Sequence, residues 1–296
     1  MSEKWPGPSR ATGWPGIADR EHQAFGWTDM IAFVLLAVSS FLFSQSEARA
    51  DEGPGMLNEG LGTPNEHGQR KLSLRSLPEP PAELKQLIGK GDITFLIGGT
   101  RPSVVDPSRS TGTRGRTFDA ETQFRLSYTF QSRCRWSWNG SPNDRELAIA
   151  VGYNRLRLNV SHLMWFEKMP ERESFWESPL VLHEFDHVRL STDPRVTSRF
   201  LSAVRQQDRV VLTREESEPL ITAASRRSGR SRYGRSSILR SLTGADAQPW
   251  LKEIVGAEFQ KAVDLIGIRY RELDRQTDHG KFAVPRTGEL HQWLHP

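Results

Sequence analysis

The residues best suited to chemistry lie in one short segment, His183-Glu184-Phe185-Asp186-His187. On a helix, residues four apart lie one turn apart on the same side, so both imidazoles can reach a single ion. Glu184 follows His183 by a rotation of about 100°, which places its carboxylate beside the ion. There the carboxylate can take a proton from a water molecule that the metal activates. The segment predicts a zinc site with His183 and His187 as ligands and Glu184 as the general base.

A helix is the expected conformation of this segment. Ser178 can cap its beginning, Pro179 suits the first helical position, and Asp193-Pro194 provides a stop. Most other residues of the segment are apolar, including a stripe opposite the histidines formed by Val181, Phe185 and Val188. Because so apolar a helix is normally buried, its polar side chains need partners, and a metal ion would be one. The alternative, histidines that are simply hydrogen-bonded, stays open.

A catalytic zinc ion usually has three protein ligands and an open fourth position. The best candidate for the third ligand is His279, because Gly280 after it is typical of a chain reversal that would fix the histidine at a helix end. Asp274 and Asp278 are alternatives, either as oxygen ligands or as acceptors that orient a histidine. Other histidines are less suitable, because they end a predicted strand or lie near the C-terminus: His162, His291 and His295.

The two histidine-bearing segments together resemble the bacterial family catalogued as domain of unknown function 922. Its members are predicted secreted zinc-dependent proteases. The likeness covers roughly residues 92–280 and includes Phe175-Trp176 ahead of HEFDH. The matching positions are His183, Glu184, His187, Asp274, Thr277, His279 and Gly280. The resemblance implies an exported zinc peptidase that acts on a peptide or protein substrate.

Some residues depart from the pattern that zinc peptidases usually show. Asp186 is a charged residue just before the second histidine, Arg189 stands where an apolar residue is usual, and Leu273 stands where an aromatic one is expected. Asp186 falls about 60° from His183, so it can add a negative charge near the ion or pair with Arg189 three residues on. These departures weaken the case for peptidase activity more than for metal binding. A non-catalytic metal-binding module of the cell envelope therefore stays an alternative.

The composition is that of a soluble globular protein. The chain has 296 residues, of which 36% are hydrophobic and 26% charged, and its formal net charge is +4. The single cysteine, Cys134, excludes an intramolecular disulfide and a cysteine-rich metal site. An arginine-rich stretch, residues 225–237, is typical of a solvated loop, and the alternative is a binding surface for anionic polymers. Because its only aromatic residue is Tyr233, specific nucleic-acid binding is not expected.

The one long apolar run, residues 31–43, predicts export to the periplasm, the cell envelope or the medium. It is shorter than the roughly 20 residues of a bilayer span and suits the apolar region of a signal peptide. Ala48 and Ala50 form a plausible cleavage site, but the charges before the run are not the expected basic region. An uncleaved anchor that associates with the membrane stays open. The predicted organisation is a signal peptide or anchor (1–50), a flexible linker (51–91), a zincin-like metal-binding domain (92–280) and a C-terminal tail (281–296).

The elements that must position the site change in kind along the domain. From residue 92 to about 160, apolar and polar residues alternate, which predicts an antiparallel, meander-like sheet of four or five strands with a turn at residues 152–154. The pattern then becomes helical, with the HEFDH helix, a second helix near 196–204 and a third near 249–273. A short helix is also expected at 81–88. Strands followed by helices predict the α+β class.

Overall fold

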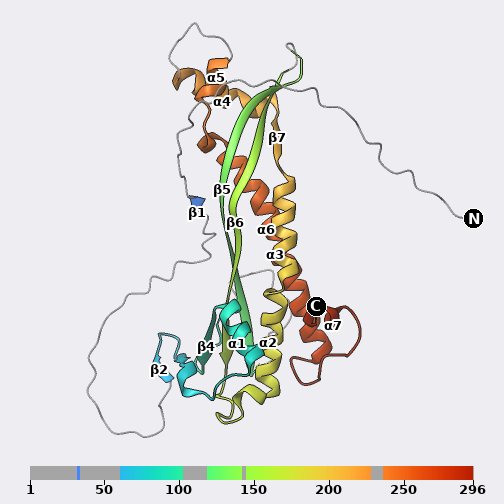
Figure 1. Cartoon of the computed structure of the whole chain (residues 1–296). Coiled ribbons are helices and arrows are strands. Elements are labelled where there is room, and N and C mark those ends of the chain that lie inside the picture. The colour runs from blue at the N-terminus through green and yellow to red at the C-terminus, as the bar shows by residue number, and fades with distance from the viewer. Residues whose placement is uncertain (1–31, 34–60, 103–118, 142–144, 228–235, 296) are drawn as a thin grey trace, which may run out of the picture. The chain divides into compact units, whose positions relative to one another are not determined.

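Two long strands, β5 (Ala120–Asn139) and β6 (Glu146–Phe166), pair antiparallel and form the main part of the sheet in the computed structural model (Figure 1). The shorter strands are β1 (Ala32–Phe33), β2 (Leu61–Pro64), β3 (Arg70–Leu72), β4 (Ile93–Ile97) and β7 (Arg209–Leu212). The strand order is β1-β5-β6-β4-β3-β2, and β7 pairs with β6. Strand β4 (Ile93–Ile97) pairs with β6 in the parallel direction. Strand β5 follows β4 in the chain and runs in the opposite direction to β6. Strands β4 and β6 therefore run in the same direction. The α+β class is confirmed. The predicted antiparallel sheet of four or five strands is wrong, because the sheet has seven strands in the part of the chain that the structure describes and one of its pairs, β4 with β6, is parallel.

The turn predicted at residues 152–154 is replaced by a β-bulge inside β6. The apolar positions of β6 are odd-numbered up to Val151 and even-numbered from Leu156 on, whereas those of β5 remain even throughout. One extra residue in β6 keeps both sets on the same face. The register between the two strands shifts at this point, and Arg155 there has a φ of 47°. The predicted pairs of shorter strands are therefore single long strands.

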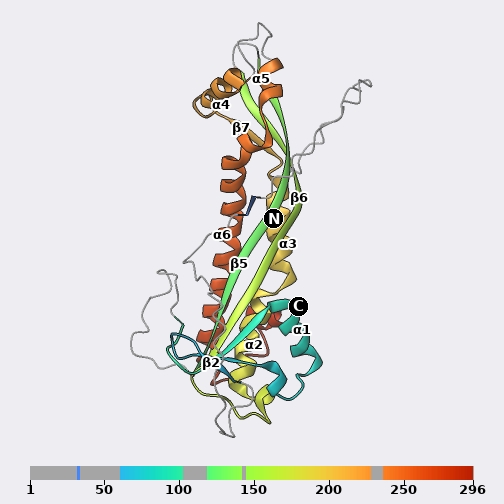
Figure 2. The ribbon, with the colours of Figure 1, turned by 90° about the vertical axis from the view of Figure 1, so that its left-hand side faces the viewer.

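Two helices cover one face of the β5-β6 pair (Figures 1 and 2). They are α3 (Pro194–Gln206) and α6 (Gly244–Thr277), with α4 (Arg214–Arg227) and α5 (Ser236–Ser241) packed near one end. Helix α6 begins before the predicted Pro249 because Thr243 and Asp246 form a capping box. The shared core includes Tyr128, Phe130, Leu147, Ile149, Phe200, Val204, Leu251 and Val255.

A second apolar cluster holds the HEFDH helix, α2 (Pro179–Ser191), against β4 and the end of β6. The 3-10 turn η3 (Phe175–Glu177) and helix α1 (Ala82–Gly91) complete it. As predicted, α2 has proline at its first position and ends before Asp193, although Ser178 makes no side-chain capping bond. The cluster includes Phe95, Met164, Phe166, Phe175, Trp176, Phe185 and Val188.

Two segments that the sequence assigned outside the domain are folded onto it. Residues 61–91 form β2 (Leu61–Pro64), β3 (Arg70–Leu72), η1 (Leu74–Ser76) and α1, instead of a flexible linker. Their few large apolar side chains, Leu72 and Leu84 among them, are spaced so that they enter the second cluster. Residues 289–294 form α7 (Glu289–Leu294), and Leu290 and Leu294 are buried. Residues 61–91 contain few large apolar side chains, but they form regular structure because those side chains pack against a core that the rest of the domain supplies.

The structure describes residues 32–33, 61–102, 119–141, 145–227 and 236–295, which lie within one of two compact units of the chain, residues 31–296. In this part of the chain no helix is both long and apolar enough to cross a membrane. Apart from the two residues of β1 (Ala32–Phe33), the predicted apolar export segment and its cleavage site lie outside the described residues. So do residues 228–235 of the arginine-rich stretch.

Candidate metal centre

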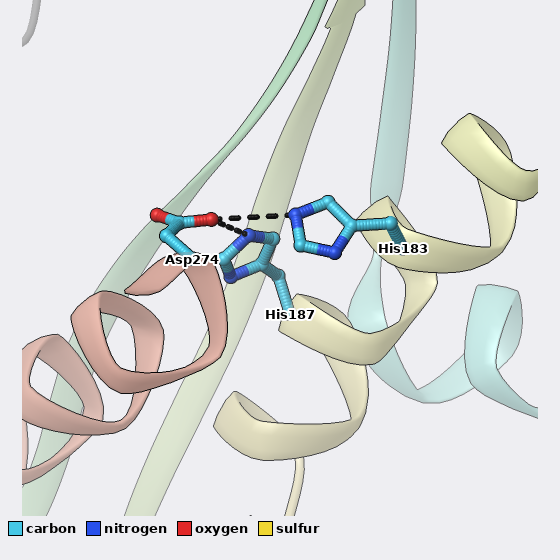
Figure 3. A group of neighbouring side chains, drawn as sticks. All are labelled: His183, His187 and Asp274. Carbon is cyan, nitrogen blue, oxygen red and sulfur yellow. Dashed lines mark hydrogen bonds and ion pairs between the residues drawn. The ribbon is translucent and has the colours of Figure 1, made fainter. Parts of the chain in front are cut away.

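Two histidines of α2 and one aspartate near the end of α6 converge on a common point (Figure 3). Nε2 of His187 is 3.0 Å from Oδ1 of Asp274, and Nε2 of His183 is 3.3 Å from the same oxygen. The ligand atoms of the three residues all lie within 4.8 Å of one another. A tetrahedral zinc ion with ligands at about 2.0–2.1 Å separates neighbouring donor atoms by roughly 3.3 Å. The two nitrogen–oxygen distances therefore suit ligands of one such ion.

The end of α6 shapes the second half of this site. The helix continues to Thr277, and three left-handed residues, Asp278, His279 and Gly280, then reverse the chain. Gly280 has a φ of 85°, and a Cβ atom there would lie 2.9 Å from Cβ and Cγ of His183. Glycine alone tolerates both the backbone conformation and this close approach. The predicted chain-reversal glycine is confirmed, and it lies directly against the first histidine.

The hydrogen bonds of the Thr277 hydroxyl favour one tautomer of His183. This hydroxyl donates to the carbonyl of Leu273 at 2.8 Å and accepts from the Gly280 amide at 3.2 Å. Nδ1 of His183 lies 3.5 Å from the same oxygen, so it is assigned as a donor. In the neutral ring, Nε2 then presents a lone pair to the carboxylate of Asp274. Two electron-rich atoms at this distance repel unless a proton or a metal cation lies between them.

The electrostatics of the cluster favour positive charge. Burial alone would raise the pKa of Asp274, but the imidazoles of His187 and His183 outweigh it and hold that pKa well below its usual range. Burial alone would lower the pKa of His187, and the carboxylate of Asp274 raises it instead. Nearby opposite charges favour the charged form of each group. A divalent cation could supply the same compensation without protonating the imidazoles.

Glu184 is buried beside the cluster with a free carboxylate oxygen. Glu184 is 3% exposed, and its Oε2 has no hydrogen-bond partner within the described part of the chain. Burial raises the pKa of Glu184, and the charges of His187 and His183 only partly offset this rise. From β5, the Thr122 hydroxyl donates to the backbone carbonyl of Glu184 at 3.4 Å. A carboxylate with a raised pKa is well suited to exchange protons near neutral pH.

A chain of hydrogen bonds supports His187 on the side of α6. The rings of Tyr270 and His187 have centroids 4.4 Å apart, and the Tyr270 hydroxyl donates to Ser191 Oγ at 3.1 Å. That oxygen lies 2.6 Å from Nε2 of His162, whose Nδ1 donates to the carbonyl of Gly91 at 2.6 Å. Both ring nitrogens of His162 thus form hydrogen bonds within the domain, in agreement with the structural role predicted for this histidine. Nδ1 of His187 has no hydrogen-bond partner among the described residues.

The third member of the cluster is Asp274, which was predicted as an alternative to His279. His279 lies next to the cluster, with its Nδ1 3.5 Å from Oδ1 of Asp274 and its side chain 33% exposed. Asp278, the other alternative, forms an ion pair with Lys281 at 2.8 Å. Because α6 runs on past Leu273 to Thr277, Asp274 lies within its last turn and faces α2.

Asp186 forms an ion pair with Arg189 and is not a member of the cluster. Arg189 also contacts Glu83 of α1 at 2.8 Å, so the pair ties α2 to α1. Burial raises the pKa of Asp186, and the guanidinium of Arg189 opposes that rise. Of the two roles left open for Asp186, the structure supports the ion pair.

Sequence reasoning did not assign three supporting residues of the site, Thr122, Ser191 and Tyr270. Tyr270 belonged to the predicted buried stripe, and its spacing of four residues from Asp274 on one helix was a usable signal. Thr122 comes from a strand far away in the sequence, so no local pattern connects it to Glu184. Ser191 looks like an ordinary helix-end serine until its neighbours in space are known.

Comparisons with protein-family models, with curated proteins and with solved structures find no match. The resemblance to domain of unknown function 922 therefore rests on its motif residues alone. Residues of the second motif lie against the first in the structure, since Asp274, Thr277 and Gly280 all lie next to His183.

Proposed function

We propose that the chain is a zinc-dependent hydrolase that cleaves peptide bonds. The observation that carries the proposal is the convergence of His183, His187 and Asp274 beside the buried carboxylate of Glu184, whose Oε2 has no hydrogen-bond partner among the described residues. Two imidazoles and one carboxylate are a ligand set known from catalytic zinc sites, which keep a fourth position open. A helix with HExxH packed against a sheet supports the zincin-like description of this half of the domain.

The chain's own residues supply the proton transfer. Zinc bound here would polarise the scissile carbonyl and increase the acidity of water. Glu184 would take a proton from the attacking water and deliver it to the departing amine. Its raised pKa helps in the first step, because a more basic carboxylate takes the proton from water more readily. Thr277 and Tyr270 hold the two imidazoles in fixed orientations, which is how outer groups tune metal ligands.

Two parts of the proposal rest on the sequence. The peptide or protein substrate follows from the resemblance to a family of predicted proteases. Export, with either a cleaved signal peptide or a membrane-associated anchor, follows from the apolar run at residues 31–43.

The metal content of the purified full chain tests the site. After incubation with zinc and dialysis without chelator, plasma mass spectrometry should find about one zinc ion per chain in the wild type. The same value is expected for His291→Ala, which removes a histidine outside the cluster. His183→Ala and Asp274→Ala should lose the ion. A folded wild-type chain that binds no zinc would overturn the proposal.

Hydrolysis is tested separately with Glu184→Gln. Glutamine keeps the shape of the side chain but cannot accept the proton, so the variant should retain zinc and lose roughly 100-fold or more in the rate of casein cleavage. A wild type that binds zinc and cleaves no peptide would support the alternative of a non-catalytic metal-binding module. The other alternative, a binding protein for anionic polymers, predicts strongly salt-dependent binding that disappears when arginines of residues 225–237 are neutralised.

A further inference from the structure

A pocket of about 420 Å³ opens at the beginning of α2, the helix that carries His183 and His187. Its wall comes from the segment that joins β6 to α2 and from the residue just before β5. Carboxylates line it at Asp119, Glu167 and Glu171, and Leu180 of α2 contributes an apolar surface together with Met169. The pocket therefore combines a mainly apolar surface with three exposed acidic residues.

Leu180 of the pocket lining lies on the same side of α2 as His183 and Glu184. Leu180 precedes His183 by three residues and Glu184 by four, and residues at these spacings are neighbours on a helix surface. On the sheet side, Asp119 precedes Thr122, whose hydroxyl contacts the backbone of Glu184. One turn of helix rises about 5.4 Å, and an extended peptide advances about 3.3 Å per residue. By this spacing, a peptide held beside His183 would reach Leu180 within about two residues.

The lining has a net negative charge. Its residues include three acidic ones and one basic one, Lys168. One of the carboxylates is held in place, because the Ser174 hydroxyl donates to Oε2 of Glu171 at 2.8 Å. The apolar part at Met169 and Leu180 offers contact to an alkyl chain. A long basic side chain fits both the apolar surface and the acidic residues. Its apolar stem can lie along the surface while its charged head stays near the carboxylates.

We propose that this pocket binds the side chain of a lysine or arginine close to the scissile bond of the peptide substrate. The proposal rests on the proposed function, because it assigns the pocket to a substrate of the same centre. An acidic side chain would be repelled by the carboxylates of Glu167 and Glu171. A neutral alkyl side chain would gain only the apolar contact.

Peptide binding to the zinc-loaded Glu184→Gln chain tests the pocket without turnover. The probes are three fluorescein-labelled pentapeptides that differ only in their central residue, which is lysine, norleucine or glutamate. Fluorescence polarisation at low salt should show the lysine peptide binding about tenfold tighter than the norleucine peptide, and the glutamate peptide weakest. Added salt should narrow these differences, because the pocket is open to solvent. Equal binding of the three peptides, or binding of none, would overturn the proposal.

Two double substitutions test whether the preference for lysine depends on the acidic residues of the pocket. Adding Glu167→Gln and Glu171→Gln should reduce the preference for lysine over norleucine to within about twofold. Adding Glu173→Gln and Glu177→Gln, which change two exposed glutamates of the same segment outside the pocket lining, should leave it unchanged. A preference that survives the first pair contradicts the assignment. A lysine preference in a wild type that cleaves no peptide overturns the proposed function alone, whereas cleavage without any charge preference overturns only the pocket assignment.

Discussion

Tyr270 and His187 are in ring contact, with centroids 4.4 Å apart, and the hydroxyl of Tyr270 donates its proton to Ser191. The tyrosine is 6% exposed, so it is a packing partner of the histidine. Its ring limits the rotation of the imidazole, and its hydroxyl limits the movement of the ring. Tyr270 therefore links the position of a candidate metal ligand to the hydrogen bonds that join α6 with α2.

Replacing Tyr270 should weaken zinc binding in two steps. Tyr270→Phe keeps the ring contact and removes one hydrogen bond, so we expect a loss of about 1 kcal/mol in unfolding free energy and a small loss of zinc affinity. Tyr270→Ala removes the ring as well, and zinc affinity should fall roughly 10- to 100-fold, as for other groups that orient metal ligands. Competition with a fluorescent zinc chelator measures both affinities. Equal affinities in the two variants would show that the ring does not position His187.

Gly280 should not tolerate even the smallest side chain. Gly280→Ala places a methyl group 2.9 Å from His183 and strains a φ of 85°, so both zinc affinity and stability should fall, the latter by about 1–3 kcal/mol. Gly256→Ala is a matched control within α6, because the nearest atom to its new methyl group is the Tyr128 hydroxyl at 3.9 Å. That control should keep its zinc affinity and gain about 0.5–1 kcal/mol in helix stability. Chemical denaturation with and without zinc distinguishes the two.

Most of the correct predictions about the fold came from the local periodicity of apolar residues. The stripe of α2 and the stop at Asp193 gave the helix that bears HEFDH, and alternation gave β4 and the apolar faces of β5 and β6. Periodicity did not separate a turn from a bulge, because both shift the apolar phase by one residue, as at Arg155. It also could not show that β4 lies beside β6, since strand pairing depends on contacts distant in sequence.

The candidate site was predictable to a similar extent. His183, Glu184 and His187 follow from helical spacing alone, whereas the choice between Asp274 and His279 depended on where α6 ends. If the helix had ended at Leu273, Asp274 would have left its last turn. Pairing across space, such as Thr122 with Glu184, leaves no trace in a single sequence.

The acid sensitivity of the metal-free protein should depend on His162. Burial lowers the pKa of His162 from its ordinary 6.5, so the unfolded chain binds a proton there more readily than the folded chain. The stability that comes from the neutral ring is therefore complete above about pH 6.5 and is lost as the pH falls toward the folded-state pKa. In the presence of chelator, the Tm of the wild type should exceed that of His162→Gln at about pH 8, and the gap should narrow below about pH 6.5. A gap that stays constant would mean that His162 does not titrate differently in the two states.

Two aspartates near the histidines should respond differently to the same change. Asp186→Asn removes the ion pair with Arg189, which lies outside the cluster, so zinc affinity should change by no more than about twofold. Asp274→Asn removes a charged oxygen that lies 3.0 Å from Nε2 of His187, and affinity should fall more than roughly 100-fold. Chelator competition at one pH measures both. A large loss in Asp186→Asn would show that its charge acts on the ion, as the departure from the peptidase pattern first suggested.

The C-terminal segment should contribute to the stability of the domain. Leu290 of α7 is 1% exposed and packs in a cluster with Leu190 and Leu273, which belong to the two helices that carry the candidate ligands. Leu290→Ala leaves a cavity there and should lower the free energy of unfolding by about 2–5 kcal/mol. Gln292→Ala is the control, because its side chain is exposed and its backbone carbonyl, which accepts from Arg195, is retained. That variant should stay within about 0.5 kcal/mol of the wild type in urea denaturation. Similar unfolding free energies for the two variants would mean that α7 does not stabilise the domain, in agreement with the predicted C-terminal tail at residues 281–296.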